Sequence, residues 1–120
     1  MLSASKFFEN VNSVFVKLDE HLLIEHCNEY TLTKTVCTFD ALAGHDVTHV
    51  FHEDDRNNIV QILTHPQEYA GVDFVHRWGT KESRFIWLKW QVIQSSETAE
   101  LYILGEDVSE QKRISAALKS

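Results

Sequence analysis

The sequence predicts an α+β fold, a five-stranded antiparallel sheet with short helices on one face. Two segments with alternating apolar residues come first, helical patterns fill the middle of the chain, and three strand-like segments follow in succession. Helices confined to the middle of the chain do not provide the crossovers that a parallel sheet needs. Antiparallel strands with the helices packed on one face are therefore the economical arrangement.

Length and composition indicate one independently folding domain. The chain has 120 residues, of which 43% are hydrophobic and 24% charged, and this is ordinary globular composition. Its 11 basic and 18 acidic side chains give a formal net charge of -7, without a basic cluster. Because such a charge repels phosphates, we expect neither nucleic acid nor an anionic membrane surface as a partner.

The sequence contains no recognisable targeting signal, and its two cysteines lack the spacing of a metal site. No apolar run in the sequence approaches the roughly 20 residues that span a bilayer, and the N-terminus lacks a basic start followed by an apolar stretch. We therefore expect a cytoplasmic location and no membrane insertion in this segment. Cys27 and Cys37 lack a CxxC spacing, so we expect two reduced thiols rather than a disulfide or a metal site.

A flanking helix and a β-hairpin are predicted at the start of the chain. The helix covers residues 1–12 and carries three apolar side chains, Phe7, Phe8 and Val11. The hairpin has apolar or aromatic residues at alternate positions on each side of a turn at 19–21, namely Val14, Val16 and Leu18, then Leu22, Ile24 and His26. This period of two is the pattern of strands.

Three helical segments are predicted in the middle of the chain. Leu32 and Val36 fall four residues apart, as on one helix face. Thr38 can cap a second short helix that ends at Gly44. The clearest helix lies within 52–65, with acids in its first turn and a stripe at i, i+3 and i+4 formed by Ile59, Ile62 and Leu63.

Three consecutive strands are predicted after this helix. The first alternates through Val72, Phe74 and His76, and the last is the short apolar segment 100–105. The long middle strand, 84–94, has one apolar face, formed by Ile86, Leu88, Trp90 and Val92.

The opposite face of the long strand is apolar at one end, at Phe85 and Trp87. A lone monomer would expose this patch. We expect either the apolar residues of 1–12 or a second subunit to cover it, and we favour a homodimer.

A last helix, 109–120, is predicted directly after the final strand. Asp107 and Ser109 carry oxygens that can accept hydrogen bonds from the first N–H groups of a helix. The apolar stripe of this helix, Ile114, Ala117 and Leu118, is too narrow for a core and suits pairing with another helix. We expect the helix to lead to a further domain, and a plain capped terminal helix is the alternative.

Four stretches of the sequence resemble the PAS domain family, the sensory and interaction modules of signalling proteins. "CNEYTLTKTVCTFDALAGHDV" has an Asn after the second strand, a hydroxyl cap and Gly44 at the family's spacing. "FHEDDRNNIVQIL" resembles the family's acidic helix start, and "KESRFIWLKWQV" its charged turn into a Trp-containing strand. "GEDVSEQK" is similar to the exit motif rich in Asp, Ile, Thr and Glu. Val36 departs from the pattern, because many members have Gly there.

The resemblance implies a PAS domain at 13–108, with 109–120 as the start of a signalling helix. It implies a non-enzymatic sensory or dimerisation module that passes a signal to an effector domain of the same polypeptide. The effector would be the histidine kinase of a two-component system or a diguanylate cyclase. The Asn-Cys-Arg-Phe sequence of flavin-bound blue-light members does not occur. Asp107 and Ser109 are the residues expected to carry the output.

Binding of a small ligand or heme is the alternative function. The identity of a cofactor is left open, and the first expectation is that the domain has none. A ligand should lie between the clearest helix and the apolar face of the strands. The predicted wall consists of Ile59, Ile62, Leu63, Val72, Phe74, Ile86, Leu88 and Trp90. Some PAS domains hold heme through a His on their long helix. His65, at the end of the clearest helix, and His26 are the histidines considered as heme ligands.

Metal binding and catalysis have little support in the sequence. His45, His49 and His52 would share one face of a continuous helix, but Gly44 and the β-branched residues that follow it argue against one. No nucleophile elbow and no glycine-rich phosphate loop occurs. Asp54 and Asp55 are interpreted as helix caps. We therefore expect neither a metal site nor an enzyme, and a small α+β enzyme is the third possibility.

Overall fold

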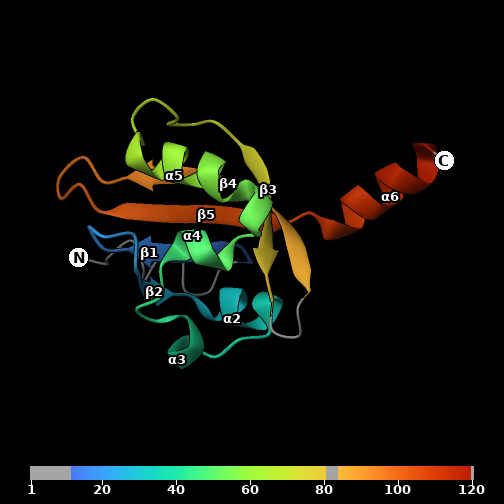
Figure 1. Cartoon of the computed structure of the whole chain (residues 1–120), viewed down its shortest axis with the longest axis horizontal. Helices are drawn as coiled ribbons and strands as arrows, with labels where there is room; N and C mark the ends of the chain where they lie inside the picture. The colour runs from blue at the N-terminus through green and yellow to red at the C-terminus, as the bar shows by residue number, and fades with distance from the viewer. Residues whose placement is uncertain (1–11, 81–83, 120) are drawn as a thin grey trace.

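A computed structural model describes residues 12–80 and 84–119 of the chain (Figure 1). One sheet is formed by β1 (Val14–Leu18), β2 (Ile24–Cys27), β3 (Phe74–Gly79), β4 (Phe85–Gln94) and β5 (Leu101–Asp107). The helical elements are α2 (Glu29–Thr35), α3 (Phe39–Leu42), α4 (Val47–Val50), the 3-10 turn η1 (Glu53–Asp55), α5 (Arg56–Thr64) and α6 (Ser109–Lys119). All strand pairs are antiparallel, in the order β2-β1-β5-β4-β3. The α+β prediction is confirmed, and the flanking helix predicted at 1–12 lies outside the described residues except for Asn12.

The helical segment between β2 and β3 closes both edges of the sheet. At the β2 edge, Ile24 donates its N–H to the carbonyl of His45 at 2.9 Å, and Gly44 donates to the carbonyl of Ile24 at 2.8 Å. At the β3 edge, the N–H of His52 donates to the carbonyl of Arg77 at 2.8 Å. Unpaired edge groups invite pairing with other chains, and these bonds occupy both backbone groups of Ile24 and the carbonyl of Arg77 within the fold.

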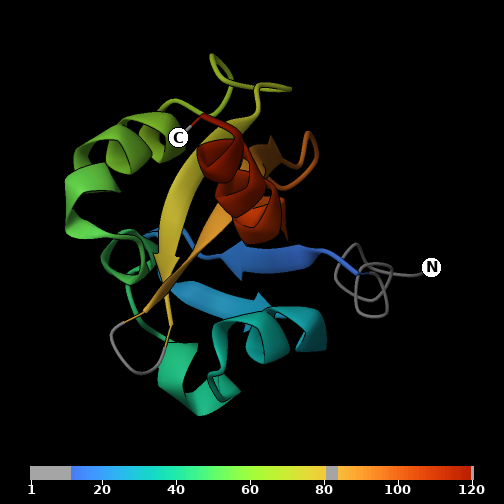
Figure 2. The same ribbon diagram turned by 90° about the vertical axis from the view of Figure 1, so that its right-hand side faces the viewer.

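The core lies between one face of the sheet and the helices α4 and α5 (Figures 1 and 2). The α5 stripe predicted from the sequence is buried, and so are Leu88, Trp90 and Val92 on β4. Pro66 follows the last turn of α5 and helps to end it, because proline restricts the backbone of the residue before it. The helix and the strand face therefore oppose each other as the two periodicities predict.

A buried polar cluster fastens the start of α2 to β1. Asn28 Oδ1 accepts hydrogen bonds from the N–H of Thr31 at 3.1 Å and from its hydroxyl at 2.6 Å. The Asn28 amide nitrogen donates to the carbonyl of Ser13 at 2.7 Å, and Phe15 donates its N–H to Thr31 Oγ1 at 3.1 Å. Because buried polar groups are costly unless they are paired, this cluster fixes where the chain leaves the sheet.

The C-terminal helix α6 extends away from the body of the domain (Figure 1). Its residues 110–118 are all exposed. In the described part of the chain, every helix is too short or too polar to cross a membrane.

The prediction that Val36 shares a helix face with Leu32 is wrong. The helix ends at Thr35, and Val36 is its C-cap with φ 54° and ψ 43°, in the left-handed region. Its side chain is 62% exposed. The left-handed conformation lets the N–H groups of the cap reach back to carbonyls of the last turn, and a β-branched residue is strained there.

Val36→Gly should therefore raise the free energy of unfolding by about 1 kcal/mol. Glycine removes most of the roughly 1–2 kcal/mol cost of left-handed geometry, and the greater freedom of the unfolded chain takes part of that gain back. Urea unfolding measures the change. Thr33→Gly, at an exposed position inside α2, is the control and should lower stability by about 0.3 kcal/mol, the difference between the helix propensities of threonine and glycine. A Val36→Gly protein no more stable than its parent would contradict the strain.

Candidate functional site

Seven of the eight residues predicted to line a ligand cavity come together in the core. Ile59, Ile62, Leu63, Leu88 and Trp90 are buried there, with Phe74 and Ile86 packed against them. Val72 lies apart from this group and is 42% exposed, because β3 begins two residues later at Phe74.

Large aromatic side chains fill the space between α4, α5 and the sheet. Phe51, which follows α4, is 1% exposed, and its ring centroid lies 5.0 Å from that of Trp78 and 5.6 Å from that of Trp90. Phe74 adds a further ring 5.6 Å from Trp90. Phe51 could not be predicted from the sequence, because a single aromatic residue between two short helices has no periodicity.

One histidine belongs to this aromatic cluster. His76 is buried on β3, and its Nδ1 accepts a hydrogen bond from the indole N–H of Trp90 at 3.1 Å. Burial, the largest influence, lowers the pKa of His76, and the nearby Arg77 charge lowers it further, while Asp55 opposes both. The neutral ring is therefore favoured, and this is the form in which Nδ1 can accept the bond.

The indole N–H of Trp78 stands out in the same cluster. Trp78 is completely buried, and its Nε1 has no hydrogen-bond partner within the described residues. A buried donor without a partner carries the full cost of its lost hydration. Such a group in a packed core calls for an acceptor, and none of the described residues supplies one.

Two hollows open at the surface on either side of this core. One of about 450 Å³ lies between Val36 to Leu42, Val50 and the end of β3 at Gly79. The other, of about 630 Å³, lies at the opposite end of the sheet, between the two hairpins and the end of α5. Its rim is acidic, with Glu25 and Glu100 both paired with Lys17.

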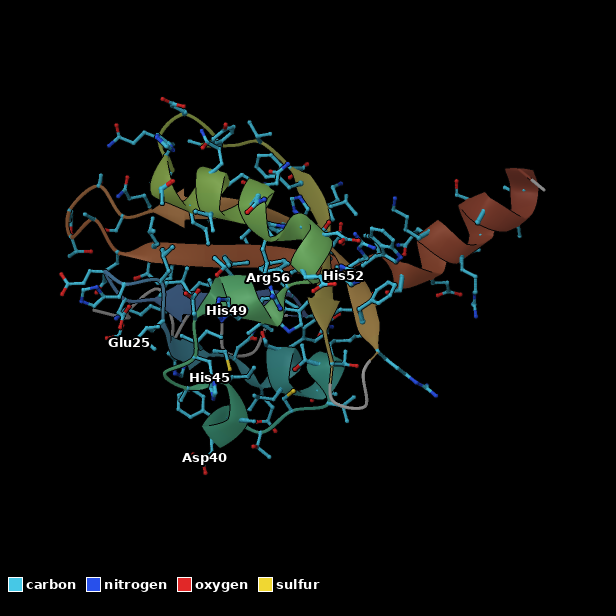
Figure 3. The ribbon with its side chains drawn as sticks, in the orientation of Figure 1. Glu25, Asp40, His45, His49, His52 and Arg56 are labelled. Atoms are coloured by element: carbon cyan, nitrogen blue, oxygen red, sulfur yellow. The ribbon has the colours of Figure 1, made fainter. Side chains whose placement is uncertain are left out.

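The histidines considered for metal or heme are dispersed. His45, His49 and His52 lie at separate places along the segment between α3 and η1 (Figure 3). Among residues 12–80 and 84–119, no three His, Cys, Asp or Glu side chains are grouped to hold a metal ion. His65 is exposed after the end of α5, with Nδ1 3.0 Å from the carbonyl of Gln61, so its ring contacts its own helix.

The exit junction, residues 107–109, is bound to β4. Asp107 Oδ1 accepts a hydrogen bond from the N–H of Ser109 at 2.9 Å, which is the capping type predicted for it. Ser109 differs from the prediction, because its hydroxyl accepts from the N–H of Trp87 at 2.9 Å rather than from the helix. Val108 donates its N–H to the carbonyl of Trp87 at 2.8 Å. The start of α6 is thus attached to the sheet through the backbone N–H and carbonyl of Trp87.

A second pair links the junction to α2. Lys34 Nζ lies 3.9 Å from Asp107 Oδ2, and the Asp107 side chain is only 17% exposed. The lysine also lies 5.6 Å from the centre of the Tyr30 ring. Sequence analysis could not find this contact, because the two partners are separated by most of the chain.

Asp55 occupies the N-cap position of α5, as predicted, but does not cap the helix with its side chain. Its side chain makes no capping bond to α5 and instead forms a two-pronged pair with Arg77, with nitrogen to oxygen distances of 3.2 and 3.0 Å. The same carboxylate accepts the backbone N–H of Arg77 at 2.9 Å. Burial, the largest influence, raises the pKa of Asp55, but the hydrogen bonds and charge of Arg77 together outweigh it and hold the pKa below its ordinary value.

The outer face of the sheet carries the predicted apolar patch. Phe85 is 44% exposed and Trp87 is half-buried. The residues predicted to cover them, Phe7, Phe8 and Val11, lie outside the described part of the chain.

Solved structures of PAS domains are similar to this chain. The PAS domain of a protein from Colwellia psychrerythraea aligns with a TM-score of 0.73 at 17% identity, over 88% of this chain and 93% of that one. The PAS domain of an HTR-like protein from Haloarcula marismortui gives 0.71 at 11% identity, over 86% and 92%. A PAS domain from a two-component sensor histidine kinase gives 0.66 at 11% identity, over 87% and 92%. The sequence matches no protein-family model and no curated protein sequence. The chain has the PAS fold, which is typical of sensory modules.

The His76 to Trp90 bond predicts a loss of stability in mild acid. The folded-state pKa of His76 lies below its ordinary value near 6.5, so the unfolded chain takes up a proton first as the pH falls. The contribution of the neutral ring is complete above about pH 6.5 and is lost as the pH falls through the folded pKa, at no more than about 1.4 kcal/mol per pH unit. Urea unfolding between pH 7.5 and 5 should show a shallower pH dependence for His76→Phe than for the parent.

The control removes an exposed side chain that carries no titratable group. Asn58→Ala, on α5, should leave the slope of stability against pH close to that of the parent. Equal slopes for the parent and His76→Phe would contradict a role for His76.

Proposed function

We propose that this chain is a non-enzymatic sensory and dimerisation module that passes a signal through α6 to an effector domain of the same polypeptide. The observation that supports this proposal most strongly is the contrast between the two ends of α6. Its base is bonded to Trp87 on β4, whereas Ile114 is 50% exposed and Leu118 is 82% exposed. A helix fixed to the sheet at one end and apolar at the other is suited to carry a change in the sheet to a partner helix.

The effector is proposed to be a histidine kinase or a diguanylate cyclase, working in the cytoplasm. The resemblance of "GEDVSEQK" to the family's exit motif supports an effector that follows α6. One of the similar solved structures is a PAS domain from a two-component sensor histidine kinase, which favours the kinase over the cyclase.

Dimerisation through α6 is supported by the spacing of its apolar residues. Ile114 and Leu118 are one turn apart, so they lie on the same side of the helix. Phe85 on the outer sheet face adds exposed apolar surface near the same end of the domain. Burying these groups against a second copy would remove them from water.

Ligand binding is the second candidate function, favoured by the unpartnered indole N–H of Trp78. A small molecule with a hydrogen-bond acceptor would satisfy it. Phe51 and Trp78 are both buried, and their rings are in contact. Such a molecule could therefore reach the Trp78 N–H only if Phe51 or another neighbouring side chain moved. The filled core therefore favours the interaction module over the ligand sensor.

The native mass of the purified protein separates these two functions. We expect twice the mass of one chain and no added mass, because the dimer is held by apolar contacts of α6. Leu118→Asp should shift the protein toward the monomer, while Ala116→Asp, at an exposed position on the opposite side of the same helix, should not. A monomer at high concentration would contradict the dimer, and a constant added mass per chain would support the ligand function.

The exit junction should be required for output. Asp107→Ala should lower the free energy of unfolding by about 0.5–2 kcal/mol, the usual effect of losing a helix cap. In the full-length protein, Asp107→Ala and Ser109→Ala should each alter the activity of the effector. The affinity for the ligand or partner that triggers the response should not change, because the two residues lie outside the core.

Thr98→Ala, in the exposed β4–β5 loop at the far end of the sheet, controls for general destabilisation. Output that responds fully to its signal after both junction changes would show that α6 is a passive tail.

A further inference from the structure

The indole ring of Trp87 lies close to two cationic side chains from different elements. Lys112 Nζ on α6 is 4.6 Å from the ring centroid, and the guanidinium carbon of Arg77 on β3 is 5.5 Å from it. Both distances fall within the roughly 6 Å at which the ring quadrupole attracts a cation. The ring of Phe85 packs edge-on against the indole at 5.8 Å. The Trp87 ring therefore joins α6 to β3 across β4.

Lys112 gives α6 a second point of attachment. Ser109, at the base of the helix, is bonded to the backbone of Trp87, and Lys112 lies almost one turn further on. One attachment point would let the helix pivot about its base. Two points along its axis restrict its direction relative to the sheet, although residues 110–118 are otherwise exposed to solvent.

Arg77 connects the same ring to the start of α5. It is paired directly with Trp87 in the β3–β4 ladder. Its guanidinium binds both oxygens of Asp55, the residue directly before α5. A planar guanidinium can bind a carboxylate along one edge while its face or another edge contacts an aromatic ring. A displacement of α5 along the sheet would therefore move Arg77 relative to the indole.

We propose that Trp87 is the positioning residue of the exit helix, whose ring sets the direction of α6 through Lys112 and transmits to it any displacement of Asp55 through Arg77. The regulatory meaning of this contact rests on the proposed function of α6. The contact itself can be tested in the 120-residue chain without any effector. Trp87 was predicted from the sequence only as part of an apolar patch on the outer sheet face. In this arrangement it also couples α6 to β3.

The first experiment uses the protein labelled with 5-fluorotryptophan, whose three ring signals are resolved by fluorine NMR. Trp87→Phe assigns the Trp87 signal. Lys112→Gln should shift that signal and raise the hydrogen-exchange rates of the first-turn amides of α6 about two- to fivefold, the range expected for one exposed cation and ring contact. Lys112→Arg keeps the cation and should restore the parent signal and rates.

Arg113→Gln is the matched control for Lys112→Gln. Arg113 is the neighbouring exposed cation, and its guanidinium lies 3.8 Å from Glu110 on the same helix. It should leave the Trp87 signal unchanged. A Trp87 signal that does not respond to Lys112→Gln, or responds equally to Arg113→Gln, would overturn the proposal.

The second experiment tests the coupling to α5 by a double-mutant cycle. Asp55→Asn should raise exchange in the first turn of α6 when Lys112 is present and should have a smaller effect in the Lys112→Gln background. Arg77→Lys, which keeps the charge and loses the two-pronged geometry, gives an independent variant if Asp55→Asn folds poorly. Equal effects in both backgrounds would show that Asp55 and α6 are not coupled through Trp87.

These outcomes are distinguishable from a failure of the proposed function. If the fluorine signals respond as expected and the junction variants leave output intact, then Trp87 positions α6 but α6 carries no signal. If the signals fail to respond while Asp107→Ala alters output, then the module transmits through the junction backbone without the Trp87 ring.

Discussion

The ion pair between Asp55 and Arg77 is the contact on which the arrangement of the fold depends. It lies at the edge strand β3, where the Asp55 carboxylate also accepts the Arg77 backbone N–H. An exposed ion pair contributes little to stability, but this one is two-pronged and largely shielded, and it fixes the start of α5 at one place on the edge. The apolar stripe of α5 then meets the Trp90 face of the sheet, while the same arginine lies beside Trp87 on the other face.

The inner face of the sheet is filled where a sensory domain could have held a ligand. Aromatic side chains bury large areas with few rotatable bonds, so Phe51, Trp78 and Trp90 make a core that resists rearrangement. The buried bond between His76 and Trp90 adds a directional contact to this packing. A stiff core moves as one body, and a force applied at an edge reaches the opposite face of the sheet instead of being absorbed by the core.

Periodicity predicted the five strands and the buried face of α5, but it did not predict the short helix α4 or the contacts between the elements. The alternation in β4 assigned Leu88 and Trp90 to the core correctly, because strand geometry alone decides which face a residue occupies. The role of Asp55 could not be read in the same way, since an acid before a helix is equally suited to cap it or to bind a distant arginine. The tertiary arrangement decides between the two, and the local pattern of a sequence does not show which distant residue lies beside Asp55. For the same reason the sequence predicted Asp107 and Ser109 as a junction but did not predict Trp87, whose backbone N–H donates to the Ser109 hydroxyl.

The exit junction completes the sheet as well as beginning a helix. The β4–β5 ladder ends at the pair of Leu88 with Asp107, which would leave the backbone groups of Trp87 without a partner from β5. The Val108 N–H takes the carbonyl of Trp87, and the Ser109 hydroxyl accepts its N–H in place of the next backbone carbonyl. Backbone groups of this kind are strongly driven to find partners. Detaching the first residue of α6 would therefore leave the Trp87 N–H without this partner, so the base of the helix is held to β4.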